Sequence, residues 1–433
     1  MKRLIIDELL KWKANPDKKP LIVFGARQVG KTYSILQFAK EEYEDVVYFN
    51  FENNAPLASV FENDLDVKRI LVALSALSGK QIFPQKTAIV FDEIQASPKA
   101  ITSLKYFCEN APEYNIIAAG SLLGVAVNRE EISFPVGKIE SITMYPMNFK
   151  EFLWATNNDA LVSMIEECYQ NDAPLMQALH RKALDLYRTY LLVGGMPECV
   201  KEYVKTQDFD FVRAKQSRIF SDYTSDMSKY STKAEALRHE ATYHSVPSQL
   251  AKENKKFQYN LIGSNARSRV YEDSIHWLTK AGIVLRCDKV NEVKNPLEFF
   301  KDNLSFKIYM SDVGLLSAKM MLSPTTVMSD INFSGEAKGA ITENYVATQL
   351  VANNERLYYW TSNSTAEVDF VLQGDSKVVP VECKSSDRVR SRSLNVCVEK
   401  YNLEYSIRIS SKNFGFENGI KSVPLYAVFC IEK

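Results

Sequence analysis

Short apolar runs alternate with longer amphipathic segments over the first third of the chain, from Lys19 to about Tyr145. Each run has the length of a buried strand, and each intervening segment has the period of a helix. This alternation predicts an α/β domain in which a parallel sheet carries helices on both faces. The five predicted strands are Leu21–Phe24, Val46–Phe51, Ala88–Phe91, Ile116–Ala119 and Ile139–Tyr145.

The pattern changes after Pro146, where a helical region begins that runs to about Tyr243. Residues 245–252 then predict a short capped helix, residues 264–281 a longer helix, and Ile283–Arg286 the start of a strand. Helix, turn, helix and strand hairpin in this order are typical of a winged helix. We therefore predict four parts, namely residues 1–150, 151–243, 244–295 and 296–433.

Composition narrows the classes of protein. The 433 residues include 53 Lys or Arg and 53 Asp or Glu, so no overall charge attracts nucleic acid or an anionic membrane. The N-terminal segment lacks the unbroken apolar stretch of a signal peptide, and no later segment approaches membrane-spanning length. The seven cysteines are scattered without a CxxC pair, which favours reduced thiols. We expect a cytoplasmic protein that makes no use of a membrane.

The loop after the first predicted strand fits the phosphate-loop pattern GxxxxGK[ST] at every fixed position. Its two glycines let the backbone approach a phosphate, while backbone N–H groups and the next helix N-terminus face the anion. Lys31 is expected to reach the β- and γ-phosphates of ATP, and the Thr32 hydroxyl to bind Mg²⁺. A chance glycine loop is the weaker alternative, because the match lies between a strand and a helix. The predicted nucleotide-binding residues are Gly25, Ala26, Arg27, Gln28, Val29, Gly30, Lys31, Thr32 and Tyr33.

Two acidic residues that follow the third predicted strand are expected to serve the same nucleotide. Asp92 stands just past a buried run, where a carboxylate can hold Mg²⁺. Glu93 is then placed to polarise an attacking water as general base. We expect the strand Ile116–Ala119 to lie beside that of Asp92, so that Ser121 senses the γ-phosphate. An ordinary Gly-Ser turn is the alternative for Ser121.

The predicted winged helix is locally basic, with nine Lys or Arg and five Asp or Glu between residues 244 and 295. Lys255, Lys256, Arg267 and Arg269 are the candidates for neutralising DNA phosphates. A surplus of four charges is modest, and it leaves open a winged helix that contacts protein or covers the ATPase.

Two consecutive predicted strands near the C-terminus carry charged residues among valines. Asp369 lies on the first, while Glu382 and Lys384, two positions apart, project from one face of the second. A hairpin can bring them together, so that the two carboxylates chelate a second Mg²⁺ or Mn²⁺ and Lys384 activates the water that attacks a phosphodiester. Glu343, on a helix predicted at 336–352, could complete the cluster. The pattern also fits an edge hairpin with an ordinary Glu–Lys surface pair.

These motifs together resemble the bacterial and archaeal AAA+ ATPases known as AAA-14, followed by a region similar to DUF4143. The resemblance rests on GARQVGKT, IVFDEIQ, AAGSLLG and SFPVGKIESITMYPMNFKEFL, then on LLVGGMPECV, SVPSQLAKENKKFQY, GAITENYVATQL and EVDFVLQGDSKVVPVECKSS. It implies an N-terminal P-loop NTPase, a helical and winged-helix middle region, and a C-terminal α/β restriction-endonuclease-like domain of the PD-(D/E)xK type. By position it implies ATPase roles for Lys31, Thr32, Asp92 and Glu93, and nuclease-like roles for Glu343, Asp369, Glu382 and Lys384. Lys138 stands where many relatives have an arginine, and a lysine lacks the bidentate fork of a trans-acting arginine.

Three functions fit these predictions. The first is an ATP-hydrolysing switch or motor that acts on DNA, the second a nucleotide-gated nuclease, and the third an ATP-regulated scaffold that binds protein partners through an inactive nuclease-like fold. We predict the first as the core activity, with ATP and Mg²⁺ as cofactors. The oligomeric state stays open, because a neighbouring subunit of a homo-oligomer could supply the arginine finger. The candidates in this chain are Arg129, Arg188, Arg213 and Arg218.

Overall fold

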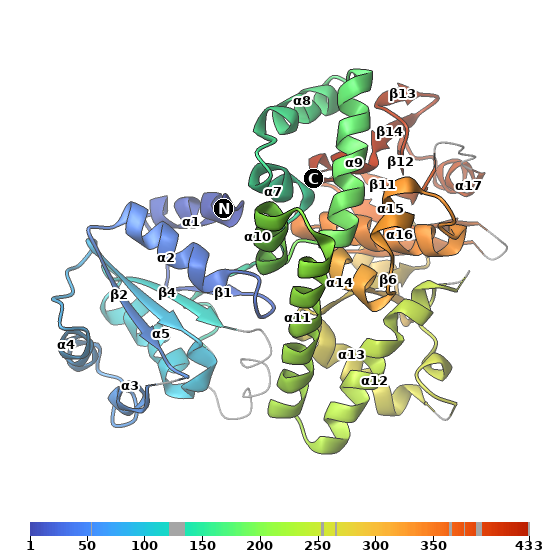
Figure 1. Cartoon of the computed structure of the whole chain (residues 1–433). Coiled ribbons are helices and arrows are strands. Elements are labelled where there is room, and N and C mark those ends of the chain that lie inside the picture. Colours follow the sequence, from blue (N-terminus) through green and yellow to red (C-terminus); the bar gives the residue numbers. More distant parts are fainter. Residues whose placement is uncertain are drawn as a thin grey trace. The chain divides into compact units, whose positions relative to one another are not determined.

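A computed structural model describes residues 1–52, 54–120, 135–252, 255–264, 266–362, 366–375, 377–386 and 392–431. The chain divides into two compact units, each with its own sheet structure (Figure 1). The smaller unit comprises Arg3–Tyr145 with Lys280–Gly282, and the larger unit comprises Met1–Lys2, Pro146–Thr279 and Ile283–Lys433. Among the described residues, no helix is long and apolar enough to cross a membrane.

The smaller unit is built on a five-stranded parallel sheet in the order β2-β3-β4-β1-β5. The strands are β1 (Leu21–Phe24), β2 (Asp45–Asn50), β3 (Thr87–Asp92), β4 (Asn115–Gly120) and β5 (Glu140–Thr143). The predicted parallel sheet is confirmed, and so is the pairing of the third and fourth strands, with Phe91 opposite Ala118. The sequence alternation places these strands correctly because three of them are buried along their whole length.

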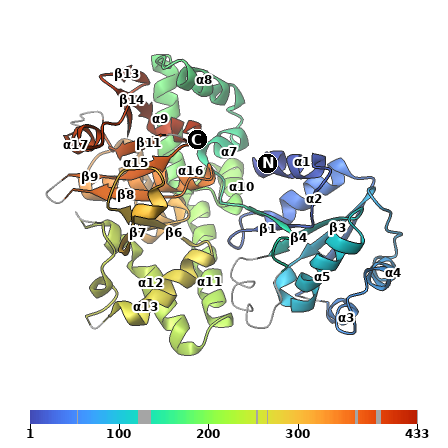
Figure 2. The same ribbon diagram turned by 180° about the vertical axis from the view of Figure 1, so that it is seen from behind.

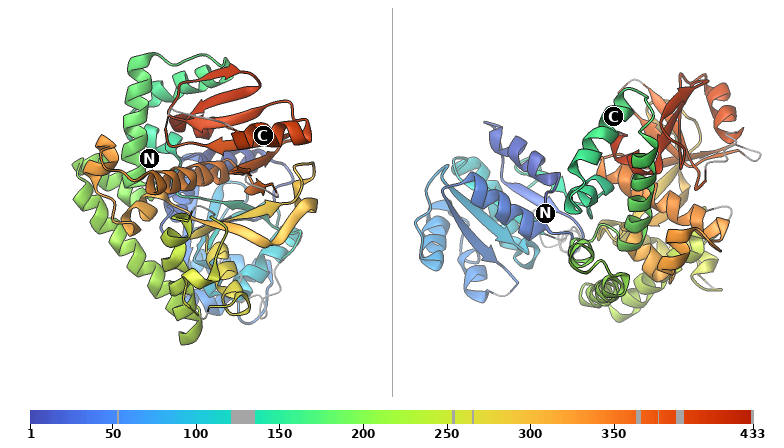
Figure 3. Two further views of the ribbon diagram at one scale, coloured as in Figure 1. Left: turned by 90° about the vertical axis from the view of Figure 1, so that its right-hand side faces the viewer. Right: turned by 45° about the horizontal axis from the view of Figure 1, so that its top comes forward.

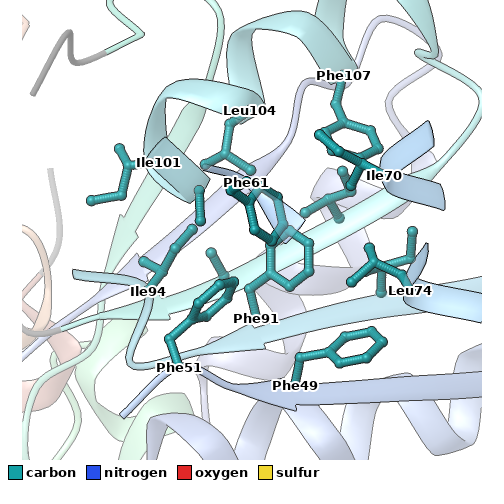
Figure 4. Close-up of a cluster of buried hydrophobic side chains, with 14 of the residues drawn as sticks. Phe49, Phe51, Phe61, Ile70, Leu74, Phe91, Ile94, Ile101, Leu104 and Phe107 are labelled. Atoms are coloured by element: carbon teal, nitrogen blue, oxygen red, sulfur yellow. The ribbon is translucent and has the colours of Figure 1, made fainter. Parts of the chain in front are cut away.

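Helices cover both faces of this sheet. The helical elements are α1 (Ile5–Ala14), α2 (Lys31–Glu42), α3 (Ala55–Val60), α4 (Val67–Ser78), the short η1 (Ile94–Ala96) and α5 (Pro98–Asn110). A phenylalanine-rich core joins α3, α4 and α5 to one face (Figure 4), where Phe91 packs edge to face against Phe51 and Phe61 at 5.5 and 6.0 Å between ring centres. On the other face α2 packs on β2, β3 and β4.

The larger unit combines many helices with two sheets (Figure 2). Its helices are α7 (Phe149–Ala155), α8 (Asp159–Gln170), α9 (Gln177–Val193), α10 (Pro197–Thr206), α11 (Phe209–Lys229), α12 (Lys233–Leu250), η3 (Tyr259–Leu261), α13 (Ser268–Lys280), η4 (Leu297–Phe300), α14 (Val313–Lys319), α15 (Pro324–Ser329), α16 (Gly335–Ala352), α17 (Arg392–Tyr401) and η5 (Leu425–Cys430). The strands are β6 (Val284–Val290), β7 (Lys301–Met310), β8 (Tyr358–Thr361), β9 (Glu367–Val368), β10 (Phe370–Gln373), β11 (Val378–Cys383), β12 (Ser406–Ser410), β13 (Gly415–Glu417) and β14 (Ile420–Pro424).

One predicted helix boundary is wrong. The separate short helix expected from Ser245 is the continuation of α12, which runs without a break from Lys233 to Leu250. A capping box at Thr232 and Glu235 starts this helix, and Pro247 near its end removes only one backbone donor. The longer helix and the strand predicted after it correspond to α13 and β6.

The two sheets of the larger unit have the orders β7-β6-β8-β9 and β10-β11-β12-β14-β13. Strands β6 and β7 form the hairpin expected after α13, but β6 also pairs in parallel with β8. Helix α16 lies between the sheets and contacts both β7 and β11 (Figure 3). Ser334 caps its N-terminus, accepting a hydrogen bond from the Ala337 N–H. This position brings the middle of α16 to the place where both sheets carry charged side chains.

Candidate functional site

The predicted phosphate loop lies between β1 and the N-terminus of α2, as its sequence pattern requires. A Cβ atom on Gly25 would lie 2.2 Å from the carbonyl oxygen of Met144, so the loop passes too close to the backbone for any side chain there. Gly30 has φ 93° and caps α2 in the left-handed region that favours glycine. The backbone geometry therefore requires glycine at both fixed positions of the loop pattern, Gly25 and Gly30.

Lys31 folds back over this loop. Its ammonium donates hydrogen bonds to the carbonyls of Gly25 (3.0 Å) and Ala26 (2.9 Å), and the residue is only 8% exposed. The cation is thus held within the loop that is expected to surround the phosphates. A phosphate is a stronger partner for an ammonium than a neutral carbonyl, because it carries formal charge.

Asp92, at the end of β3, is the centre of a small polar network. Its carboxylate accepts hydrogen bonds from the Thr32 hydroxyl (3.0 and 3.1 Å) and from the Tyr48 hydroxyl (2.7 Å). The two predicted magnesium ligands, Thr32 and Asp92, therefore touch although 60 positions separate them in the sequence. A hydroxyl beside a carboxylate fits Mg²⁺, which takes few protein oxygens and keeps several waters.

Glu93 has an unusual backbone. Its φ of 49° lies in the left-handed region, which is strained for a residue with a side chain. Its carboxylate accepts a hydrogen bond from the amide of Gln95, a residue of η1 that is 4% exposed. The turn after β3 therefore aims Glu93 in a fixed direction, as a general base requires.

Two further residues at this site were not predicted. Arg3 is 7% exposed and donates to the carbonyls of Val29 in the phosphate loop (2.8 Å) and Tyr145 (2.9 Å). It looked like one of several basic residues before an amphipathic helix. Tyr48 is one of several aromatic residues on a strand, and only the pairing of Asn50 with Asp92 across β2 and β3 places it near the carboxylate. Burial, opposed by Asn50 and reinforced by Asp92, raises the pKa of Tyr48, so its hydroxyl stays a donor at neutral pH.

Several other predicted ATPase residues stay predictions. Ser121 and Arg129 lie outside the described residues. Tyr33 is 61% exposed, and Lys138 pairs with Glu109 at 2.9 Å. The three other arginine-finger candidates, Arg188, Arg213 and Arg218, belong to the unit that does not contain the phosphate loop.

Glu343, in the middle of α16, is the centre of a buried ionic cluster in the larger unit. It is 3% exposed and accepts hydrogen bonds from Lys307 (3.0 Å), the Tyr309 hydroxyl (2.6 Å) and Lys255. Burial by itself would raise the pKa of Glu343, but Lys255 and Lys307 lower it to about 2. Lys307 is fully buried and also pairs with Glu367 at 2.5 Å. This carboxylate is therefore held ionised by its lysine partners.

The four residues predicted to contact DNA separate into two groups. Lys255 is 18% exposed at its side chain and points its ammonium to Glu343. Burial lowers the pKa of Lys255, but Glu343 and Asp369 raise it more strongly, so the pKa is raised overall. Lys256, Arg267 and Arg269 are exposed, before and at the start of α13. These three stay candidates for a phosphate-binding surface.

Asp369 lies at the bend between β9 and β10, and Glu382 lies on β11, which pairs with β10 in the five-stranded sheet. The antiparallel register of β10 and β11 ends at Phe370 opposite Val381, the residues that adjoin Asp369 and Glu382. Asp369 accepts a hydrogen bond from the Cys383 N–H at 2.8 Å. Burial, with the charge of Glu343 in the same direction, raises the pKa of Asp369 to about 6, against the opposing lysines.

Glu382 and Lys384 form an ion pair of 2.9 Å on the strand face that their spacing predicted. The second carboxylate oxygen of Glu382 is buried and has no hydrogen-bond partner among the residues that the structure describes. Within those residues no group of three or more His, Cys, Asp or Glu could hold a metal. Asp369 and Glu382 stay the predicted donors for a second metal.

Three families match successive parts of the chain. Residues 17–153 match the family described as AAA domain, residues 184–326 a domain of unknown function (DUF8612), and residues 338–428 a domain of unknown function (DUF4143). The chain thus carries an AAA-type P-loop ATPase domain followed by a DUF4143 region. The resemblance to AAA-14 and DUF4143 is confirmed to this extent.

Two uncharacterized proteins of Methanocaldococcus jannaschii are similar to the chain. One, MJ1637, is 24% identical over 46% of this chain and 42% of its own length. The other, MJ1544, is 24% identical over 88% of this chain and 78% of its own length. The chain therefore spans less than half of the first relative and about three quarters of the second.

Solved structures that resemble this chain have low TM-scores. The Walker-type ATPase of Pyrococcus abyssi covers 74% of this chain and 95% of its own at 14% identity, with a TM-score of 0.44. The Aeropyrum pernix ORC1 protein in complex with DNA covers 73% and 90% at 14% identity, with a TM-score of 0.29. Scores this low carry no argument about the action of this chain.

Proposed function

We propose that this chain binds ATP with Mg²⁺, hydrolyses it, and uses the cycle as a switch that acts on DNA. The contact between Thr32 and Asp92 beside the phosphate loop carries the proposal. It joins the hydroxyl expected on Mg²⁺ to the carboxylate expected to hold the metal hydration shell. Two chance features so far apart in sequence would have no reason to meet at the mouth of a phosphate loop.

Each residue of this site has a distinct task in the proposed reaction. Backbone N–H groups of the loop bind the phosphates, and Lys31 exchanges the carbonyls of Gly25 and Ala26 for phosphate oxygens. Thr32 and Asp92 would hold Mg²⁺, which would neutralise the charge that develops on the phosphates. Glu93, oriented by its turn, takes the proton of the attacking water.

Nucleotide binding is tested with Lys31→Ala. This variant loses the charge that meets the phosphates, so we expect no measurable ATP binding in isothermal titration calorimetry of the full chain. Lys40→Ala is the matched control, because Lys40 is exposed on the same helix. Equal ATP affinity in Lys31→Ala and wild type would remove the phosphate loop as the binding site.

The DNA part of the proposal is supported by the exposed cations Lys256, Arg267 and Arg269. Each phosphate contact contributes roughly one to the slope of log affinity against log salt concentration. The double variant Arg267→Ala with Arg269→Ala should therefore lower this slope by up to about two in fluorescence anisotropy with a labelled duplex. Lys205→Ala, exposed on α10, is the control. An unchanged slope would exclude these two arginines as phosphate contacts, and no binding of wild type at low salt would leave an ATP-regulated scaffold that binds protein.

Metal-dependent nuclease activity is a second candidate, favoured by one observation. Among the described residues, one buried oxygen of Glu382 has no hydrogen-bond partner, and a cation could satisfy it. We expect cleavage of labelled DNA with Mg²⁺ or Mn²⁺ to disappear in Glu382→Gln and to persist in Glu404→Gln, an exposed control. Wild-type protein that leaves single- and double-stranded DNA intact under all these conditions would exclude this candidate.

A further inference from the structure

A pocket of about 130 Å³ lies in the larger unit, apart from the nucleotide site and the Glu343 cluster. Its wall is formed by α9, by α15 and the segment that follows it, by α16, by η5 and by the loops that follow β11 and β12. Its polar side chains are two cations, one acid and several hydroxyls, namely Arg188, Lys338, Asp330, Thr342, Ser385 and Ser411. The neighbouring wall is apolar and includes Phe333 and Leu184. A cavity with convergent polar groups on one side and carbon on the other is typical of a ligand site.

The charges on this wall suit an anion. Lys338 pairs with Asp330. Among the residues that the structure describes, Arg188 donates one hydrogen bond, of 2.6 Å, to Asp185, which lies off the wall and is 63% exposed. A guanidinium has five N–H donors, so Arg188 keeps most of its fork for a ligand. Such a fork matches the oxygens of a phosphate or carboxylate.

The position of the pocket relative to the sheet also indicates a ligand site. Strands β11 and β12 run parallel, with Cys383 opposite Ile409, and the pocket takes Ser385 and Ser411 from just beyond their carboxyl ends. In sheets with parallel strands, ligands bind outside the carboxyl ends. The Thr342 hydroxyl lies 3.4 Å from the hydroxyl of Tyr187, and both residues are buried. Hydroxyl-bearing residues from several elements thus line the pocket together with the two cations.

The volume decides how much of a ligand enters. Pockets that enclose a whole drug-sized molecule measure about 300–1,000 Å³, whereas this one measures about 130 Å³. It therefore suits a single anionic head group whose organic body rests against the apolar wall near Phe333. A phosphomonoester carries close to two negative charges at neutral pH, so it attracts the Arg188 guanidinium more strongly than a carboxylate does, whereas Lys338 is already paired with Asp330.

We propose that this pocket binds the phosphate group of a phosphomonoester, carried by a nucleoside monophosphate or by the 5′ end of a DNA strand. This site is additional to the nucleotide site, and every residue that lines it belongs to the unit without the phosphate loop. Because Ser385 directly follows Lys384 in the chain, a strand end held here would lie close to the second candidate site.

The test is calorimetric titration of the full chain with thymidine 5′-monophosphate and, separately, with thymidine. We expect binding of the monophosphate and none of the nucleoside. Arg188→Ala should weaken binding by about tenfold or more, since it removes a charge-assisted contact. Arg181→Ala, exposed on the same helix, should leave the affinity unchanged. Lys338→Gln tests the second cation, and unchanged circular dichroism of each variant shows that it folds.

Lys31→Ala separates this pocket from the phosphate loop. Binding that survives Lys31→Ala and is lost in Arg188→Ala supports the pocket, even if the chain hydrolyses no ATP. Binding lost in Lys31→Ala and unchanged in Arg188→Ala would overturn the proposal, as would equal affinity for thymidine and its monophosphate. Titrations with inorganic phosphate and with a 5′-phosphorylated decanucleotide identify which molecule carries the bound phosphate. A DNA strand end should bind more tightly than inorganic phosphate or thymidine 5′-monophosphate.

Discussion

Replacing Glu343 by glutamine is expected to destabilise the larger unit by about 3 kcal/mol. The amide keeps the shape of the side chain but removes the charge that faces Lys255 and Lys307. Both lysines would then be buried beside a neutral group, and Lys307 is fully buried. The prediction distinguishes a structural ion cluster from a catalytic carboxylate, which is the role that resemblance to nucleases implies for Glu343.

Two arguments give this magnitude. A pKa lowered from 4.5 to about 2 corresponds to about 3 kcal/mol of folding free energy at neutral pH. Removing one member of a buried ion pair costs about 3–5 kcal/mol, and Lys307 keeps Glu367 as a partner, which favours the lower end. Because the folded pKa is the lower one, this stability is complete above pH 4.5 and is lost as the pH falls toward 2.

Thermal unfolding of the full chain, followed by calorimetry, measures the effect. Glu343→Gln should lower the Tm of the larger unit by roughly 5–10 °C. Glu336→Gln, exposed on the first turn of α16, should leave it unchanged. Adding Lys255→Met should recover part of the loss, since it removes one uncompensated charge. A Glu343→Gln variant as stable as wild type would refute the ion-pair account of this cluster.

Three further variants test the two sites. Gly25→Ala should abolish ATP binding in a calorimetric titration, because its Cβ would meet the Met144 carbonyl at 2.2 Å; wild-type affinity would contradict the described loop. Tyr48→Phe should lower kcat for ATP hydrolysis about tenfold, because it removes one hydrogen bond to a carboxylate. The ATP affinity should stay within twofold of wild type. An unchanged kcat would show that Tyr48 does not position Asp92. Asp369→Asn should stabilise the larger unit by up to about 3 kcal/mol at pH 7.5 and less at pH 5, because ionisation destabilises the fold as the pH rises from 3.8 through about 6. A lower Tm at pH 7.5 without added metal would contradict this sign.

The sequence was sufficient to predict the architecture of the smaller unit. Buried parallel strands are continuous apolar runs, so β1 begins and ends as predicted and β3 and β4 extend one residue beyond each end of their runs. The phosphate loop was equally visible, because its glycines and lysine are adjacent in sequence. Strand alternation also placed Glu382 and Lys384 on one face, where they pair.

Contacts between residues far apart in the sequence could not be predicted from such local patterns. Lys255 and Lys307 lie 88 and 36 positions from Glu343, and periodicity gives no sign that either ammonium turns inward. Lys255 was counted among the exposed cations for that reason. Local signals also failed at Ser245, where a separate short helix was predicted although α12 continues through this position to Leu250. Arg3 reaches the phosphate loop by tertiary folding alone.

The rate of Mg²⁺-dependent ATP hydrolysis tests the central claim most directly, with wild type, Glu93→Gln and the exposed control Glu41→Gln measured at saturating ATP. The account predicts steady turnover in wild type and control, and loss of turnover by about a hundredfold or more in Glu93→Gln with ATP binding retained. Wild-type protein that binds ATP without hydrolysing it, or Glu93→Gln that turns over at the wild-type rate, would contradict it.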